Sequence, residues 1–207
     1  MNARELLDLA PVVPVVVLDD ADAAVPLARA LVAGGLRAIE VTLRTDAAIA
    51  AIERIAAEVP DAVVGAGTVV TPSDARRSLA AGAKFLVSPG CTPALRDAMT
   101  ETGLPFLPGV SSASEAMALL EHGITEMKFF PAEAAGGTAY LKSLGGPLPQ
   151  IRFCPTGGIT PESASRYLAL PNVGCVGGSW LTPADAVRAG DWDRIESLAK
   201  QAAALAA

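Results

Sequence analysis

The stretch that decides the fold is Val12-Val13-Pro14-Val15-Val16-Val17-Leu18, a nearly continuous run of valines that contains one proline and ends in leucine. A run that is apolar at successive positions is typical of a strand buried on both faces of a parallel sheet. The segment from Asp22 to Ala33 carries apolar residues at helical spacing and ends at Gly34-Gly35, a typical helix stop. Together the two segments form one strand–helix unit.

The same unit recurs along the chain at intervals of roughly 20 to 25 residues. The expected strands are Val12–Leu18, Ala38–Leu43, Ala62–Thr68, Phe85–Ser88, Pro105–Val110, Glu126–Pro131, Arg152–Thr156 and Val173–Val176. Several helices are expected to begin at a proline, as in Pro161 to Leu168, and the last to run from Trp192 to Leu205. Such alternation predicts an α/β fold, a single (β/α)8 TIM barrel domain over residues 1–207 with a short helix at Met1 to Leu9 before it.

The alternative architecture is an open doubly wound sheet. That fold is expected to carry a glycine-rich dinucleotide loop after its first strand, and Leu18-Asp19-Asp20 has no glycine. The barrel interpretation also requires that chemistry gather at the carboxyl ends of the strands.

Composition narrows the classes of function. Of the 207 residues 51% are hydrophobic, yet no apolar run reaches the roughly 18 to 20 residues of a membrane span. The segment from Met1 to Asp8 lacks the order of a signal peptide, and three widely spaced cysteines fit reduced thiols, so we expect a soluble cytoplasmic protein. One histidine and no CxxC or HExxH motif predict no metal and no cofactor. A net charge of −6 without a basic run argues against nucleic acid as partner.

Lys128 is the unusual residue of the sixth expected strand, because the other three lysines flank apolar segments or lie on polar ones. The period of two places Lys128 and Phe130 on one face and Met127 and Phe129 on the other. Burial of an ammonium costs free energy and favours the neutral, nucleophilic amine. The alternative is a lysine that reaches solvent from an edge strand or closes a buried ion pair.

The second strand carries three polar side chains on one face. Glu40, Thr42 and Arg44 are expected to face the barrel interior. One interpretation is a general acid/base beside a nucleophilic amine, with a guanidinium that holds an anion such as a carboxylate. The alternative is a structural ion pair of Glu40 with Arg44 or with Lys128.

Small residues end several strands. Gly65-Ala66-Gly67-Thr68 ends the third strand and lets a substrate approach the backbone beside the Thr68 hydroxyl. Thr156-Gly157-Gly158 ends the seventh strand and Gly177-Gly178-Ser179 the eighth. In a barrel these two loops are neighbours and commonly hold a phosphate with backbone N–H groups, although each can also be a simple tight turn. A phosphorylated small molecule is therefore predicted as ligand.

Five motifs in order carry a family resemblance: Glu40-Val41-Thr42-Leu43-Arg44, Gly65-Ala66-Gly67-Thr68-Val69, Lys128-Phe129-Phe130-Pro131-Ala132-Glu133, Cys154-Pro155-Thr156-Gly157-Gly158-Ile159 and Gly178-Ser179-Trp180. The chain resembles the class I 2-keto-3-deoxy-6-phosphogluconate (KDPG) aldolases, which include the 4-hydroxy-2-oxoglutarate (KHG) aldolases. The resemblance implies a cytoplasmic, homotrimeric, metal-independent Schiff-base lyase of the Entner–Doudoroff pathway. Such an enzyme splits KDPG reversibly into pyruvate and glyceraldehyde 3-phosphate.

The resemblance also implies a role for each site residue. Lys128 takes the position of the Schiff base and Glu40 that of the general acid/base. The implied substrate-binding residues are Arg44 and Thr68 for the pyruvate carboxylate, Thr156 for hydroxyls, and Gly157, Gly158, Gly178 and Ser179 for the phosphate. For Glu133, five residues after Lys128, two interpretations stay open: a residue that supports the site, or a surface residue.

Other functions compete with this assignment. The main substrate of the enzyme is either KDPG, KHG or 2-keto-3-deoxy-6-phosphogalactonate, which differs from KDPG at C4. A phosphosugar isomerase would explain the glycine loops but leaves Lys128 without a role. A non-enzymatic phosphometabolite-binding barrel would use Lys128 and Glu40 only as a structural pair.

Overall fold

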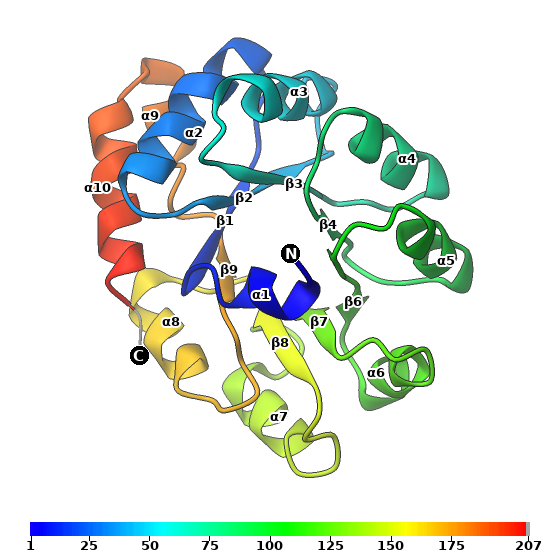
Figure 1. Cartoon of the computed structure of the whole chain (residues 1–207). Coiled ribbons are helices and arrows are strands. Elements are labelled where there is room, and N and C mark those ends of the chain that lie inside the picture. The colour runs from blue at the N-terminus through cyan, green and yellow to red at the C-terminus, as the bar shows by residue number, and fades with distance from the viewer. Residues whose placement is uncertain (206–207) are drawn as a thin grey trace.

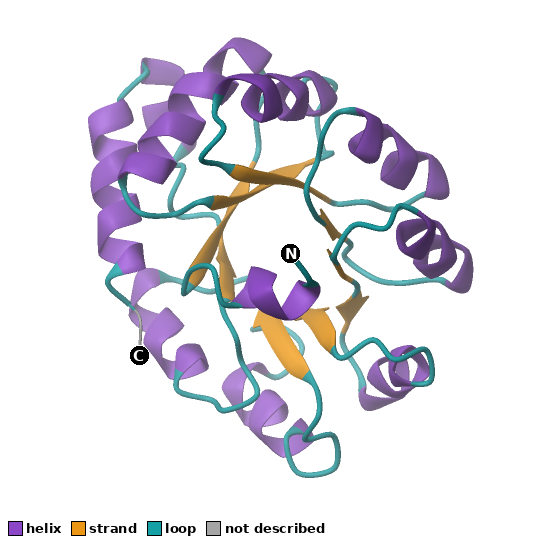
Figure 2. Cartoon of the chain, viewed as in Figure 1, coloured by secondary structure: helices purple, strands orange, loops and turns teal. Residues whose placement is uncertain are grey.

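Parallel strands form the centre of the molecule, and helices surround them in the computed structural model, which describes residues 1–205 (Figures 1 and 2). Six strands form one sheet in the order β5-β4-β3-β2-β1-β9, and three form a second in the order β6-β7-β8. The strands are β1 (Val12–Val16), β2 (Ala38–Thr42), β3 (Val63–Gly67), β4 (Leu86–Val87), β5 (Phe106–Leu107), β6 (Gly109–Val110), β7 (Glu126–Phe129), β8 (Arg152–Pro155) and β9 (Val176–Gly178).

The helices lie outside the strands, which curve around a common centre in Figure 2. They are α1 (Ala3–Leu7), α2 (Ala24–Ala33), α3 (Ala48–Glu58), α4 (Pro72–Ala80), α5 (Pro93–Glu101), α6 (Ala113–Leu120), α7 (Gly137–Leu144), α8 (Pro161–Leu168), α9 (Ala184–Ala189) and α10 (Trp192–Ala203), with a 3-10 turn at Ala21–Ala23. The expectation of an α/β fold with parallel strands is confirmed. No helix among residues 1–205 is long and apolar enough to cross a membrane.

Three helices begin with the same two residue types. α4, α5 and α8 each have threonine as N-cap and proline in the first turn. The sequence predicted the proline start of α8. The threonine hydroxyl accepts a backbone N–H of the first turn, and proline has the φ of a helix and no N–H to leave unpaired. α9 was not predicted, because six residues are too few to show a helical pattern. It ends at Gly190, whose backbone is in the left-handed region.

Most strands are one or two residues shorter at an end than the sequence predicted, and two strands differ in a way that has a clear local cause. The expected fifth strand is divided into β5 and β6 by Pro108, which has no N–H to donate to a neighbouring strand. The expected eighth strand begins at Val176 instead of Val173, because the Val173 N–H donates to Leu170 in a turn. Pro14 in β1 is accommodated where the register changes: Val12 to Pro14 pair with β9, and the following two valines pair with β2.

α1 closes the amino-terminal end of the space between the strands (Figure 1). Its Leu6 and Leu7 are buried in a cluster with side chains from several strands, among them Val13 of β1 and Cys154 of β8. The residue after the helix, Asp8, forms an ion pair with Arg152 at the start of β8, at 2.9 Å. Because this end is filled by apolar side chains, access to the interior is left to the carboxyl ends of the strands.

Candidate active site

A buried ion pair lies between β2 and β7. Nζ of Lys128 is 3.3 Å from Oε1 of Glu40, and the two residues are 4% and 2% exposed. They are 88 positions apart in sequence, so the fold alone brings them together. Two charges removed from water to this extent are tolerated because each compensates the other. Of the two ion pairs considered for Glu40, the structure contains the one with Lys128.

Gly67 of β3 provides the space for the Glu40 carboxylate. A Cβ atom at this position would lie 2.1 Å from Oε1 of Glu40 and 2.5 Å from its Cγ. Thr42, two residues beyond Glu40, is fully buried and donates its hydroxyl to the Val16 carbonyl at 2.9 Å. Thr42 therefore supports the strand, whereas Glu40 has an oxygen available for the lysine.

Phe130 follows β7 and shares the face of Lys128, as the period of two predicted. Nζ of Lys128 lies 5.2 Å from the centre of the Phe130 ring, within the range of a cation–π contact. On the opposite face, Phe129 is fully buried and stacks on Tyr140 of α7. The strand thus presents one apolar face to the helices and one reactive face to the interior.

A cavity of about 280 Å³ opens beside this pair. Five of the predicted site residues are among its lining: Arg44, Thr156, Gly157, Gly158, Ser179, together with Val15, Phe130, Ile159 and Gly177. Phe130 touches both the cavity and the lysine, so the cavity adjoins the ion pair. Sequence reasoning missed Val15, Ile159 and Gly177 as lining residues; Phe130 carried a signal, since it was placed on the face of Lys128.

Arg44 lines the cavity, but it does so from the rim and not from the inner face of β2 as expected. β2 ends at Thr42, and the turn that follows breaks the alternation of faces, so Arg44 is exposed at the rim. Its Nε lies 3.4 Å from Oγ1 of Thr68 and donates to it. Thr68 has a φ of 57°, a left-handed conformation that is unusual for a β-branched residue and often occurs at functional sites.

The two glycine-rich loops lie side by side, as the sequence predicted. Thr156 and Gly177 form a β-bridge, and both line the cavity. Gly157 and Gly158 have φ values of 105° and 79°, which favour glycine. Ser179 is exposed at the mouth. Gly178 does not line the cavity; a Cβ there would lie 2.3 Å from the Trp180 ring, so its role in substrate binding stays a prediction.

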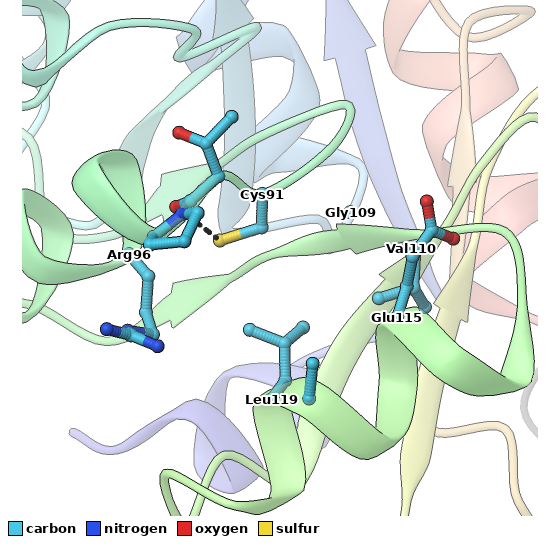
Figure 3. A pocket seen from close by; sticks show the side chains of 9 residues that line it. Cys91, Arg96, Gly109, Val110, Glu115 and Leu119 are labelled. Carbon is cyan, nitrogen blue, oxygen red and sulfur yellow. Dashed lines mark hydrogen bonds between the residues drawn. The ribbon is translucent and has the colours of Figure 1, made fainter.

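A second, smaller cavity of about 140 Å³ lies between α5 and α6 and contains Cys91, Arg96 and Glu115 (Figure 3). Burial raises the pKa of the Cys91 thiol to about 11, so the thiol stays protonated. Arg96 pairs with Asp97 at 2.6 Å, and Glu115 accepts backbone N–H groups at the start of α6. Each polar group here has a structural partner, and none of the predicted site residues lines this cavity, whereas five line the first. Among residues 1–205 no three histidine, cysteine, aspartate or glutamate side chains are grouped to hold a metal ion.

Comparison with known proteins gives concordant matches. The family model described as KDPG and KHG aldolase matches residues 3–198. A 2-dehydro-3-deoxy-phosphogluconate aldolase of Pseudoalteromonas atlantica is 56% identical over 207 residues, which are 100% of this chain and 96% of the relative. A KHG/KDPG aldolase of Escherichia coli is 54% identical over 201 residues, 97% of this chain and 94% of the relative.

Solved structures agree with the sequence matches. A KDPG aldolase of Legionella pneumophila, with pyruvate captured at low pH as a covalent carbinolamine intermediate, has a TM-score of 0.96 and 45% identity, and the match covers 98% of each chain. A KDPG aldolase of Zymomonas mobilis with 3-phosphoglycerate has a TM-score of 0.92 and 48% identity, and the match covers 97% of this chain and 94% of the other.

Proposed function

Because the chain belongs to the KDPG and KHG aldolase family, it is a class I aldolase that cleaves KDPG to pyruvate and glyceraldehyde 3-phosphate, and we propose that its Schiff base forms on Lys128. The observation that carries the proposal is the buried pair of Lys128 and Glu40 beside a cavity lined by glycine-rich loops. A nucleophilic amine, a proton acceptor at 3.3 Å and a site for an anionic group are the parts that this chemistry requires.

The reaction follows from these two groups. Glu40 accepts a proton from Lys128, and the neutral Nζ attacks the C2 ketone of the substrate to give a carbinolamine. Glu40 returns the proton to the C2 hydroxyl, which leaves as water, and a protonated imine forms. Glu40 then takes the proton of the C4 hydroxyl while the C3–C4 bond breaks and its electrons neutralise the imine. The aldehyde is released, and an enamine remains on Lys128. This enamine is protonated at C3, and the resulting imine is hydrolysed to pyruvate and free lysine.

The remaining predicted residues would orient the substrate. We assign Arg44 and Thr68 to the pyruvate carboxylate, since a guanidinium forms strong charge-assisted hydrogen bonds with carboxylates. Thr156 would contact the substrate hydroxyls. The phosphate would lie against Gly157, Gly158 and Ser179, with the Gly178 loop behind it. Binding of the phosphate, remote from the reacting carbon, would hold C2 in position for attack.

KHG is proposed as a second substrate. Lys128, Glu40, Arg44 and Thr68 are all assigned to the 2-keto acid end, which KHG and KDPG share. The relative from Escherichia coli carries both substrates in its name.

The finer description of fold and assembly is part of the same proposal. We propose that the strands close into one (β/α)8 barrel over residues 1–207. Only Pro108 separates β5 from β6, and two bridges, Phe153 with Val173 and Thr156 with Gly177, join β8 to the β9 segment. A homotrimer in the cytoplasm and a place in the Entner–Doudoroff pathway follow from the family resemblance, and sedimentation equilibrium would test the trimer.

Borohydride trapping tests the Schiff base. Reduction in the presence of pyruvate should give a stable adduct, located by mass spectrometry on the peptide that contains Lys128. The Lys142→Met variant, which lacks an exposed lysine of α7, should form the adduct as the wild type does. Absence of an adduct under conditions where pyruvate binds, or an adduct on another lysine, would refute the mechanism.

A further inference from the structure

A hydrogen bond outside the reactive pair connects Glu133 and Tyr167. The Tyr167 hydroxyl, on α8, donates to Oε1 of Glu133 at 2.8 Å, and Tyr167 is 1% exposed. Glu133 lies just beyond β7, on the segment that also carries Lys128. Burial, and after it the bond to Glu133, raises the pKa of Tyr167 well above its ordinary value, so the hydroxyl stays protonated and can donate.

Glu133 also contacts the glycine turn that lines the cavity. Its backbone N–H donates to the Gly157 carbonyl at 3.1 Å. A Cβ at Gly158 would lie 2.9 Å from both Cβ and Cγ of Glu133, so the glutamate stem packs directly against Gly158. The turn therefore has the cavity on one side and Glu133 on the other, and Tyr167 holds the end of the glutamate from the helix that follows the turn.

Such a support has a physical purpose at this turn. Glycine has more backbone freedom than any other residue, and a turn with two consecutive glycines loses that freedom when a ligand orders it. A turn held in its binding conformation before the ligand arrives avoids this cost. The hydrogen bond also fixes one oxygen of the Glu133 carboxylate toward α8, which limits how the negative charge can approach a bound phosphate.

We propose that Glu133 and Tyr167 are a positioning pair that fixes the Gly157–Gly158 turn in the shape that receives the substrate phosphate. The inference rests on the proposed function of that turn. It answers the question that the sequence left open about Glu133: the residue supports the site from behind. Neither side chain is placed in contact with the reacting atoms, so the pair should act on substrate affinity and leave the chemical steps unchanged.

Three variants and two ligands test the pair. Tyr167→Phe and Glu133→Ala each remove the hydrogen bond, whereas Glu133→Gln keeps an acceptor oxygen for the tyrosine. We expect the first two to raise KM for KDPG by about tenfold, because the ligand must then order the turn itself, with kcat within about twofold. Glu133→Gln should stay near the wild-type KM. The double variant Glu133→Ala with Tyr167→Phe should have a KM for KDPG no higher than that of the more impaired single variant, because the two residues act through one bond.

Pyruvate is the internal control, because it has no phosphate and cannot reach the turn. Its rate of borohydride trapping on Lys128 should be the same in all variants. Tyr140→Phe is the matched control: Tyr140 is the other tyrosine of the chain, and no hydrogen bond of its hydroxyl is found within residues 1–205. It should leave KM for KDPG unchanged.

The outcomes separate the inference from the proposed function. If the wild type neither cleaves KDPG nor traps pyruvate on Lys128, both fail. If the wild type does both, two results with Tyr167→Phe would refute the positioning pair alone. One is an unchanged KM for KDPG, and the other is a loss of kcat together with slower pyruvate trapping. Should Tyr167→Phe fail to fold in a thermal melt, the comparison of Glu133→Ala with Glu133→Gln decides: equal KM values for KDPG would overturn the inference.

Discussion

Replacement of Gly67 by alanine should disable the reaction although it replaces no reactive group. The new Cβ would lie 2.1 Å from Oε1 and 2.6 Å from Cδ of Glu40, whereas ordinary contact begins at 3.4 Å. The Glu40 carboxylate must therefore move by more than about 1 Å, a displacement that can lower a rate by about a hundredfold. Because Glu40 is 3.3 Å from Nζ of Lys128, the move separates the amine from its proton acceptor.

The assay is steady-state cleavage of KDPG, followed through pyruvate release. We expect Gly67→Ala to lower kcat by about a hundredfold, equivalent to about 2.7 kcal/mol of transition-state free energy, with slower borohydride trapping of pyruvate. The control is Gly146→Ala, where the nearest atom to a built Cβ is 4.0 Å away. A Gly67→Ala protein with wild-type melting temperature and a kcat within twofold of the wild type would show that the position of Glu40 does not limit the reaction.

Three further predictions concern the cavity mouth, a helix cap and the core. Ser179→Ala should raise KM for KDPG by about tenfold and that for KHG far less; equal effects would remove Ser179 from the phosphate site. Hydrogen bonds from the Ser111 backbone N–H and from Ser112 lower the pKa of Glu115, which caps the start of α6. The stability that this cap contributes is therefore complete above the ordinary carboxyl pKa and is lost as pH falls through the lowered value. Glu115→Gln should thus melt about 2 °C below the wild type at pH 7, and this difference should disappear below about pH 4. A difference that is the same at both pH values would contradict the role of Glu115 as a cap. Phe129→Ala should lower the free energy of unfolding by about 3 to 5 kcal/mol in urea denaturation, and a loss under 1 kcal/mol would contradict its place in the core.

Local rules worked well wherever a residue's environment depends on its neighbours in sequence. The period of two placed Lys128 with Phe130 and against Phe129, and the distances confirm both. Proline marked the start of α8, which spans Pro161–Leu168 as predicted. These features were predictable because strand alternation and helix capping are set by a few adjacent residues.

Local rules failed where the chain leaves a regular element. Continued alternation placed Arg44 on the inner face of β2, but the strand ends at Thr42, and Arg44 lines the cavity from the turn that follows. Pro108 divides a strand that an apolar pattern made continuous. Nothing in the pattern of apolar residues records where backbone hydrogen bonding stops.

The sequence by itself determined the class of fold, the strand that carries Lys128 and the residue types that the chemistry needs. Only the tertiary structure decided that Glu40 pairs with Lys128 and not with Arg44, that Gly67 is the space for its carboxylate, and that Tyr167 holds Glu133. The physical reason is that these contacts join residues far apart in the chain. Period and propensity fix the direction of a side chain relative to its own strand or helix, whereas its partner depends on how the strands curve around a common centre.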